Sequence, residues 1–337
     1  MLNGGFTLPP KQFEDRTLQL AWNELEKYVS RRFAGHGSAA EVGFEIVAVL
    51  PGYQVCVKGR QMVFRGADAV NILYSVYEFA ERFLGYCFFK PGYDIDPFHS
   101  TPVSIPDGTI IDASPLLKRR GFIQEFPFSN DSFILADWMA KNRLNYLMTW
   151  MKYYDRITDE LRDSFAVRGI EIESGHHNFD YWIPLEKYSQ TNPEFFAVVD
   201  GKRTKYDPAD STLLLSKQLC TTNPELRREI VANMVDYCRR HPEIKTISLI
   251  PNDGFGWCEC PECSKFYDPQ RKGEAYSVSA HVYKADAIYH DLCRDVAAQM
   301  GAALPGIQIT FCAYVNYSGP SDGFKLAGNM AVHFAPY

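Results

Sequence analysis

Residues 121–177 read GFIQEFPFSNDSFILADWMAKNRLNYLMTWMKYYDRITDELRDSFAVRGIEIESGHH, and this stretch decides the fold. Short β-rich runs alternate with longer runs in which apolar residues recur at helical spacing. The pattern predicts strands at 121–125, 144–150 and 169–173 and helices at 131–141 and 158–167. Strands separated by helices predict a parallel sheet, and this region is therefore expected to be α/β.

The same alternation continues toward the C-terminus, after a long insertion that runs to about Leu219. Asn223 and Pro224 are typical of a helix start, because Asn caps exposed N–H groups and proline is tolerated in the first turn. Further strands are expected at 246–251, 307–314 and 329–335, and helices at 224–240 and 276–300. The six strands predict a (β/α)₈ TIM-type barrel truncated after about six strands, as in a fragment of a longer protein. An open sheet is the alternative.

The residues before this region predict a separate, small α/β domain. Helices are expected at 15–32 and 68–84, with short strands at 44–50, 53–57 and 61–64 between them. A proline-rich passage from Pro91 to Pro106 then leads to a boundary near Ala113. We therefore predict an N-terminal α/β domain over residues 1–113 and a partial TIM barrel over residues 114–337.

Composition narrows the classes of partner. The 337 residues carry a net charge of −6 and contain no Lys/Arg run longer than three residues, so we expect no nucleic-acid partner. No apolar stretch approaches the roughly 18 residues of a membrane helix. Met1–Pro10 has no signal-peptide pattern, and nothing in the sequence specifies an oligomeric state. The 14% aromatic content suits either a large core or sugar-binding surfaces.

Polar and aromatic residues follow the predicted strands, where a TIM barrel places its active residues. They are Glu125, Trp150, Glu173 with His176 and His177, Asn252 with Asp253, Tyr314 and His333.

Asp253 is the strongest catalytic candidate, since a buried strand leads directly to it. Glycosidic cleavage needs a carboxylic acid to protonate the leaving oxygen and usually a second carboxylate. Asp253 is the candidate for the acid, and Glu125 or Glu173 is the candidate for the second carboxylate. The competing interpretation is that Asn-Asp-Gly forms only a turn.

The remaining candidates would bind substrate. Trp150 and Trp257 are expected as stacking walls for a sugar ring, although a lone Trp is more often core. His176 and His177 are expected to hold a hydroxyl or to orient a carboxylate; the alternative is a loop whose histidines satisfy local backbone groups.

Cys258, Cys260 and Cys263 form a C-x-C-x-x-C cluster. Its spacing suits one tetrahedral metal, with Cys220 as the best fourth ligand. We therefore expect a structural zinc, against the alternatives of a disulfide plus a free thiol or three unligated thiols. Four protein ligands would leave no open position for water, which disfavours a metal-dependent hydrolase.

The sequence resembles known protein families. Ala69–Tyr86, Pro91-Gly92 and the run to Arg119-Arg120-Gly121 resemble the N-terminal domain of α-glucuronidases and β-N-acetylhexosaminidases. The rest is similar to a bacterial family of glycoside-hydrolase-like barrels related to those enzymes. The segments that carry this likeness are Gly175-His176-His177, Asn192–Phe196, Gly201-Lys202-Arg203, Gln218–Pro224 and Asn252-Asp253-Gly254 with the cysteine trio.

The resemblance implies roles for several residues. Arg120 matches an arginine that holds sugar hydroxyls, and Glu125 matches an acidic residue beyond it. Glu173–His176 is similar to the acidic-x-x-Gly-His segment of the third strand, with one residue instead of two between the acid and the glycine. The Asp-Glu pair of the hexosaminidases falls on Asn252-Asp253, which implies that Asp253 is the general acid. Asn252 departs from that pair and puts N-acetyl-assisted hydrolysis in doubt.

Together these observations predict a glycoside hydrolase acting on a glycan, with no cofactor required for catalysis. The resemblance also implies a periplasmic or secreted protein. The alternative is a non-catalytic carbohydrate-binding barrel that keeps the aromatic walls without a working carboxylate pair.

Overall fold

The structure is a computed structural model that describes residues 2–34, 36–98, 102–209, 217–267 and 284–335. The chain forms two compact units, each built from segments that are separate in the sequence. The first unit comprises Met1–Phe122, Pro127–Leu147 and Arg156–Glu171, and the second comprises Ile123–Phe126, Met148–Asp155 and Ile172–Tyr337. Because each unit contains separate segments of the chain, the division into domains at residue 113 stays a prediction.

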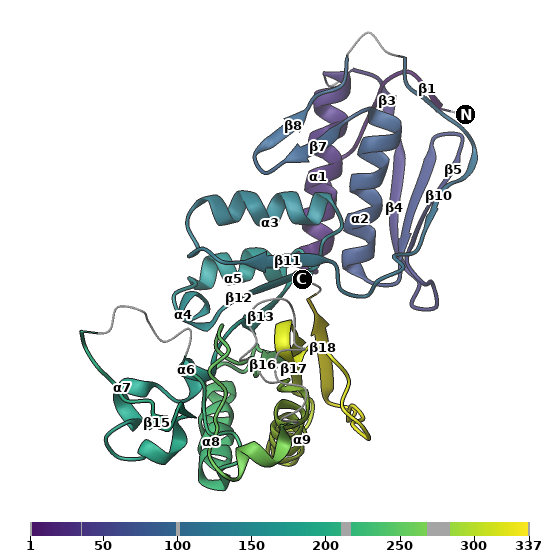
Figure 1. The fold of residues 1–337 in the computed structure, drawn as a ribbon. Helices are drawn as coiled ribbons and strands as arrows, with labels where there is room; N and C mark the ends of the chain where they lie inside the picture. Colours follow the sequence, from purple (N-terminus) through teal and green to yellow (C-terminus); the bar gives the residue numbers. More distant parts are fainter. Residues whose placement is uncertain (1, 35, 99–101, 210–216, 268–283, 336–337) are drawn as a thin grey trace. The chain divides into compact units, whose positions relative to one another are not determined.

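The first unit is built on a four-stranded sheet with two long helices (Figure 1). Strand β5 pairs antiparallel with both β10 and β6, and β6 pairs in parallel with β4. Apolar residues of this sheet and of both helices form one core. These elements are α1 (Arg16–Phe33), β4 (Glu41–Ile46), β5 (Tyr53–Lys58), β6 (Gln61–Gly66), α2 (Ala69–Phe79) and β10 (Gly108–Ala113).

Smaller elements complete this unit. A π-helical turn, Ala80–Leu84, extends α2, so the helix expected over 68–84 changes its hydrogen-bond pattern in the last turn. The others are β1 (Leu2–Asn3), β2 (Phe6–Thr7), β3 (Ser38–Ala39), β7 (Cys87–Lys90), β8 (Tyr93–Ile95), β9 (Ser104–Ile105), α3 (Asp131–Lys141) and α5 (Asp159–Ala166).

The second unit contains a six-stranded sheet in the order β11-β12-β13-β16-β17-β18. The pairs from β13 to β18 are parallel, as the alternation of strands and helices predicts. Such a sheet is consistent with part of a barrel. Its strands are β11 (Gly121–Gln124), β12 (Tyr146–Trp150), β13 (Glu171–Gly175), β16 (Thr246–Ser248), β17 (Gln308–Ala313) and β18 (Met330–Phe334), and the first residues of β11, β12 and β13 belong to the first unit.

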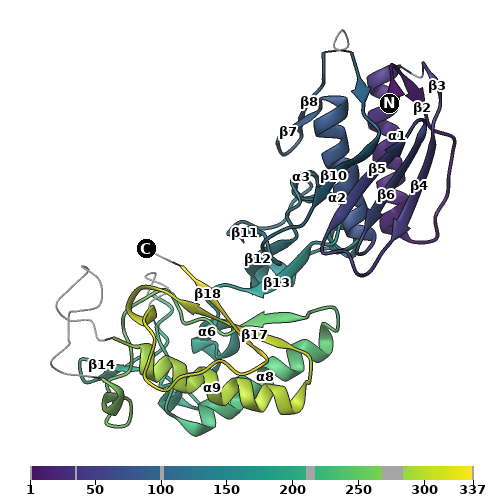
Figure 2. The ribbon, with the colours of Figure 1, turned by 90° about the vertical axis from the view of Figure 1, so that its right-hand side faces the viewer.

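Two long helices, α8 (Pro224–Arg240) and α9 (Asp286–Ala303), pack side by side in the second unit (Figures 1 and 2). Their apolar residues share a core with β16 and β17. The helix expected over 276–300 is present as α9, which begins later, at Asp286, and ends at Ala303; residues 276–283 lie outside the described residues. Short helices are α4 (Met151–Tyr154), α6 (Phe179–Trp182) and α7 (Leu185–Tyr188), and β14 (Val198–Val199) pairs with β15 (Lys202–Arg203).

No helix within these described ranges has both the length and the apolar character that a membrane crossing requires.

The contribution of the N-terminal cap of α8 to stability can be tested by mutation. Asn223 Oδ1 accepts hydrogen bonds from Glu225 N at 2.9 Å and from Leu226 N at 3.2 Å. We expect Asn223→Ala to lower the free energy of unfolding by about 1 kcal/mol, because two N–H groups of the first turn lose their acceptor. Asn223→Asp keeps the acceptor and is the matched control. Urea unfolding of both variants checks this, and equal losses would contradict the capping role.

Candidate functional site

The C-terminal ends of the sheet strands deliver a group of polar and aromatic side chains within the second unit. Glu125 follows β11, Trp150 ends β12, His176 and His177 follow β13, and Tyr314 follows β17. Since parallel strands bring their carboxyl ends to one edge, side chains far apart in sequence meet there.

Four rings from three strands form a continuous series, which we call the aromatic row. The ring centroids of Trp150 and His176 lie 4.3 Å apart, and those of His176 and His177 lie 4.7 Å apart. His177 and Tyr314 continue the row at 6.1 Å. Lys152 Nζ lies 4.9 Å from the Trp150 ring centroid, which adds a cation at this end of the row. The structure therefore brings together four residues that the sequence predicts as substrate contacts.

His176 is held as a neutral imidazole. Its backbone has φ of 68°, an uncommon conformation for a residue other than glycine. Burial, and next the neighbouring charge of His177, lower the pKa of His176 to about 3. Its Nε2 lies 3.3 Å from Glu125 Oε1, and its buried Nδ1 has no hydrogen-bond partner in the described part of the chain. The neutral ring therefore donates from Nε2 to Glu125, whose side chain is 62% exposed.

Asn178 fastens the end of β13 to the end of β16. Its buried Nδ2 donates to the Ser248 carbonyl at 2.7 Å, and its Oδ1 accepts from Ile250 N at 2.9 Å. Its backbone N–H donates to the Ile250 carbonyl, and His177 Nδ1 donates to the Pro251 carbonyl. The histidine pair and the segment that leads to Asp253 are thus one hydrogen-bonded assembly.

Asn252 and Asp253 have different environments although they are adjacent. Asn252 is 2% exposed; its Oδ1 accepts from Asp180 N at 3.1 Å and its Nδ2 donates to the Lys217 carbonyl at 2.7 Å. Asp253 is exposed. Burial raises the pKa of Tyr317, and the negative charge of Asp253 raises it further. Asn252 is expected from the sequence to contact substrate. In the structure its amide holds the loop, and Asp253 is the group presented to solvent.

Asp180 is a site residue that the sequence analysis missed. It lies in the first turn of α6, and its N–H bonds to the side chain of Asn252, next to Asp253. Burial raises the pKa of Asp180, while the nearby charges of Lys152 and His177 act in the opposite direction. Its position three residues after His177 was the available signal, because a short segment after a strand stays close to the strand end.

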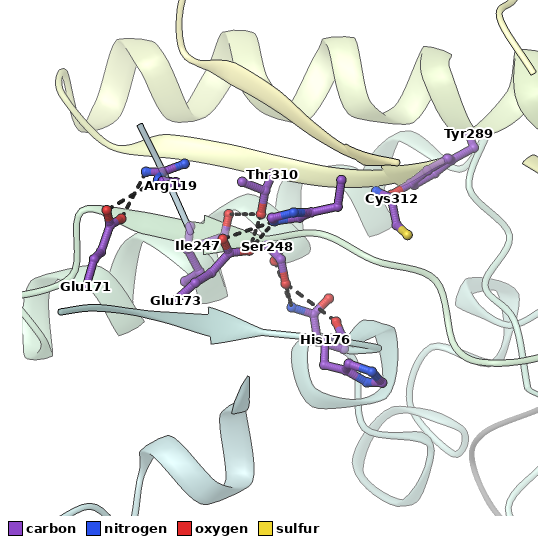
Figure 3. Close-up of polar contacts among 11 residues, drawn as sticks. Arg119, Glu171, Glu173, His176, Ile247, Ser248, Tyr289, Thr310 and Cys312 are labelled. Carbon is purple, nitrogen blue, oxygen red and sulfur yellow. Dashed lines mark hydrogen bonds and ion pairs between the residues drawn. The ribbon is translucent and has the colours of Figure 1, made fainter. Parts of the chain in front are cut away.

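Glu173 lies inside the sheet. Its carboxylate is 0% exposed and accepts from Thr310 Oγ1 and, at 3.1 and 3.2 Å, from His333 Nε2 (Figure 3 shows Glu173 with Thr310). The sequence predicts a catalytic Glu173 and a substrate-binding His333. In the structure Glu173 has no solvent-accessible side-chain surface, since Thr310 and His333 pack against its carboxylate, and it holds His333 on β18.

Two further predicted contacts have other roles. The Arg120 guanidinium donates to the carbonyls of Arg143, Leu117 and Lys118 within the first unit. Trp257 is 2% exposed and packs on Tyr289 and Tyr317, so it belongs to the core and offers no open face. We therefore leave Arg120 and Trp257 out of the candidate site.

The cysteines predicted as metal ligands gather in one place. The Sγ atoms of Cys220, Cys258, Cys260 and Cys263 all lie within 4.8 Å of one another.

Comparison with known proteins gives a family and a fold. The family model described as Domain of unknown function (DUF4838) matches residues 96–337, which is more than half of the chain. A comparison with curated protein sequences finds no match.

Solved structures of hexosaminidases share the fold. A β-N-acetylhexosaminidase from Bacteroides fragilis has a TM-score of 0.52 at 16% identity, covering 99% of this chain and 66% of its own. A mutant Streptomyces plicatus β-hexosaminidase in complex with GlcNAc has a TM-score of 0.58 at 11% identity, covering 99% and 65%. A glycoside hydrolase family 20 exo-β-N-acetylglucosaminidase from Vibrio harveyi, in complex with N-acetylglucosamine, has a TM-score of 0.52 at 9% identity, covering 99% and 54%.

These likenesses establish a glycoside-hydrolase-like fold. The chain spans between 54% and 66% of the length of these three structures. The relation to hexosaminidases that the sequence predicts is therefore present in the fold, and the relation to α-glucuronidases stays a prediction.

The neutral His176 predicts a pH dependence of stability. Its pKa is about 3 in the folded chain and near the ordinary 6.5 when unfolded, so below pH 6.5 only the unfolded chain gains this proton. Stability should therefore fall as the pH falls from 6.5 toward 3, by roughly 1.4 kcal/mol per pH unit.

The matched variant is His176→Asn, because Asn tolerates a positive φ. Between pH 7 and pH 5 the unchanged protein should lose about 2 kcal/mol more unfolding free energy than His176→Asn. Urea unfolding at the two pH values measures the difference. The exposed His36, as His36→Asn, serves as control and should keep the full pH dependence. Equal pH dependence in His176→Asn and the unchanged protein would contradict the neutral, buried ring.

Proposed function

The chain belongs to the DUF4838 family, and we propose that it is a glycoside hydrolase that cleaves O-glycosyl bonds of a glycan, with Asp253 as the proton donor. One observation carries the proposal: an exposed aspartate follows a buried parallel strand, and a row of aromatic rings lies at the ends of three other strands of the same sheet. The glycoside-hydrolase-like fold supports it, since barrels of this kind carry their chemistry at these strand ends.

The chemistry requires two groups. Asp253, in its carboxylic acid form, donates its proton to the glycosidic oxygen while the bond from that oxygen to the anomeric carbon breaks. A water oxygen bonds to the anomeric carbon, and its proton passes to a second carboxylate. The products are the released alcohol and the free sugar. The second carboxylate then releases its proton to solvent and Asp253 takes one up, so both groups return to their starting forms.

We assign the second carboxylate to Asp180. Its backbone is tied to Asn252, next to Asp253, whereas Glu173 is enclosed by Thr310 and His333. Glu125 is the other accessible carboxylate, and its contact with His176 suits it to hold a sugar hydroxyl. The ring faces of Trp150 and Tyr314 suit the C–H faces of a pyranose.

The substrate is proposed only as a glycan. The compared structures act on or bind N-acetylated sugars, as their names state. In this chain the Asn252 side chain is buried and both its Oδ1 and its Nδ2 bond to backbone groups, so it is not presented to a substrate acetamide. We therefore do not extend the hexosaminidase activity to this protein. A complete eight-stranded barrel, with further site residues on additional strands, is part of the same proposal.

A non-catalytic carbohydrate-binding barrel is the second candidate. The burial of Glu173 favours it, because one of the three carboxylates that the sequence predicts for catalysis has no accessible surface. Such a protein would bind sugars at the aromatic row and turn nothing over.

Leaving-group dependence separates the roles of the two aspartates. On a panel of aryl glycosides and natural glycans, Asp253→Asn should lower kcat/KM by about 100-fold or more for poor leaving groups. The loss should be much smaller for nitrophenyl glycosides, because a good leaving group departs without a proton. Asp180→Asn should lower kcat/KM equally for both kinds of leaving group.

Asp236→Asn on the surface of α8 is the control and should be fully active, since Asp236 pairs with Arg240 at the exposed helix surface. Isothermal titration with the same sugars is run in parallel. Turnover that survives Asp253→Asn on every substrate would contradict the proton-donor role. Sugar binding without turnover in the unchanged protein would select the carbohydrate-binding barrel.

A further inference from the structure

The four-cysteine cluster joins two segments that are about forty residues apart in sequence. Cys220 precedes α8, and Cys258, Cys260 and Cys263 follow the Asp253 loop, which we define as residues 251–257. Cys220 Sγ lies 3.6 Å from Cys260 Sγ and 3.8 Å from Cys263 Sγ. All four are free thiols.

The spacing of the sulfur atoms matches one particular arrangement. Four thiolates at about 2.3 Å from a tetrahedral ion lie about 3.8 Å from one another. A disulfide would need an S–S distance of about 2.05 Å. The observed separations of 3.6 and 3.8 Å therefore fit a common central ion.

We propose that Cys220, Cys258, Cys260 and Cys263 bind one structural zinc ion. Four thiolates in a tetrahedron are a donor set that zinc prefers. Because four protein ligands complete the coordination sphere, no position is left for water or substrate, and the ion has a structural role.

The surroundings suit thiolate ligands. Val198 N donates to Cys258 Sγ at 3.3 Å, and Thr222 Oγ1 lies 3.1 Å from Cys263 Sγ, where its hydroxyl can donate. Such donors outside the metal sphere orient the ligands and spread their negative charge. Three of the cysteines are buried and Cys260 is partly exposed, so zinc would compensate the charge of thiolates that burial would otherwise disfavour.

The ion would complete an attachment that hydrogen bonds begin. Gln218 Nε2 donates to the carbonyls of Asn252 and Gly254, and Lys217 and Gly256 form a parallel bridge. The segment Lys217–Cys220 therefore runs along the Asp253 loop, and zinc would fix the far end of that loop. This consequence concerns loop stability and does not depend on any catalytic activity.

Metal analysis of the full chain tests the proposal. Protein purified without a chelator or a metal-affinity tag should contain about one zinc per chain by plasma mass spectrometry. Cys260→Ser should lower this content severalfold, and its partial exposure makes it the ligand whose substitution disturbs the core least. Cys87→Ser is the matched control, since Cys87 is an exposed free thiol on β7, and it should keep the full content.

Cobalt gives a readout that needs no variant. After zinc is removed and Co²⁺ is added, the unchanged protein should show thiolate-to-cobalt charge transfer and the visible bands of tetrahedral cobalt. Zinc removal should also speed hydrogen exchange in peptides covering residues 251–263 and leave β4–β6 unchanged. Protein without zinc that also fails to develop the cobalt spectrum would overturn the proposal, as would a disulfide between any two of the four cysteines in nonreducing peptide mapping.

Discussion

The buried amide of Asn178 is the interaction on which the candidate site depends. It bonds to Ser248 and Ile250, and so replaces sheet pairing at the point where β13 and β16 end. Without it, the carbonyl of Ser248 and the N–H of Ile250 would be buried without these partners, which costs more than an exposed hydrogen bond does. The positive φ of His176 lies two residues before this junction. The chain therefore turns sharply after β13 and returns a backbone edge to β16, and both histidine rings are directed into the aromatic row by that turn.

The elements with strong local signals could be predicted from the sequence. Helices α3 and α8 have the predicted limits, because apolar residues recur at helical spacing in both and Asn223 marks the start of α8. Strand β10 was missed, since Gly108–Ala113 follows a proline-rich passage and its pairing with β5 is nonlocal. The short α6 was missed as well, because four residues carry too little periodicity. The parallel order of β13, β16, β17 and β18 followed from the alternation of strands and helices, a property of the whole chain.

For the candidate site, whether a residue could be predicted depended on its position relative to a strand end. Residues that end a strand or directly follow one, such as Trp150, His176 and Tyr314, do come together, since the strand end determines their place. Arg120 and Asn252 carry hydrogen-bonding groups that backbone partners already use, and no sequence pattern shows which partners a polar group will have. Glu173 lies within β13, and contacts with Thr310 and His333 on strands distant in the sequence bury it, which no local pattern shows. His176 comes after the last residue of β13 and therefore reaches the edge of the sheet.

The buried hydrogen bonds of Asn252 therefore position the exposed carboxylate of Asp253. Asp253 is exposed and makes no hydrogen bond among the described residues, so its position must be imposed from both sides of its loop. On one side, Asn252 is held by Asp180 and Lys217, and its amide cannot move without leaving buried polar groups unpaired. On the other side, Trp257 is packed in the core and Cys258 begins the cysteine cluster. A short loop fixed at both ends loses little entropy when a ligand binds, and a reactive carboxylate gains most from such an arrangement, because its geometry is set before the substrate arrives.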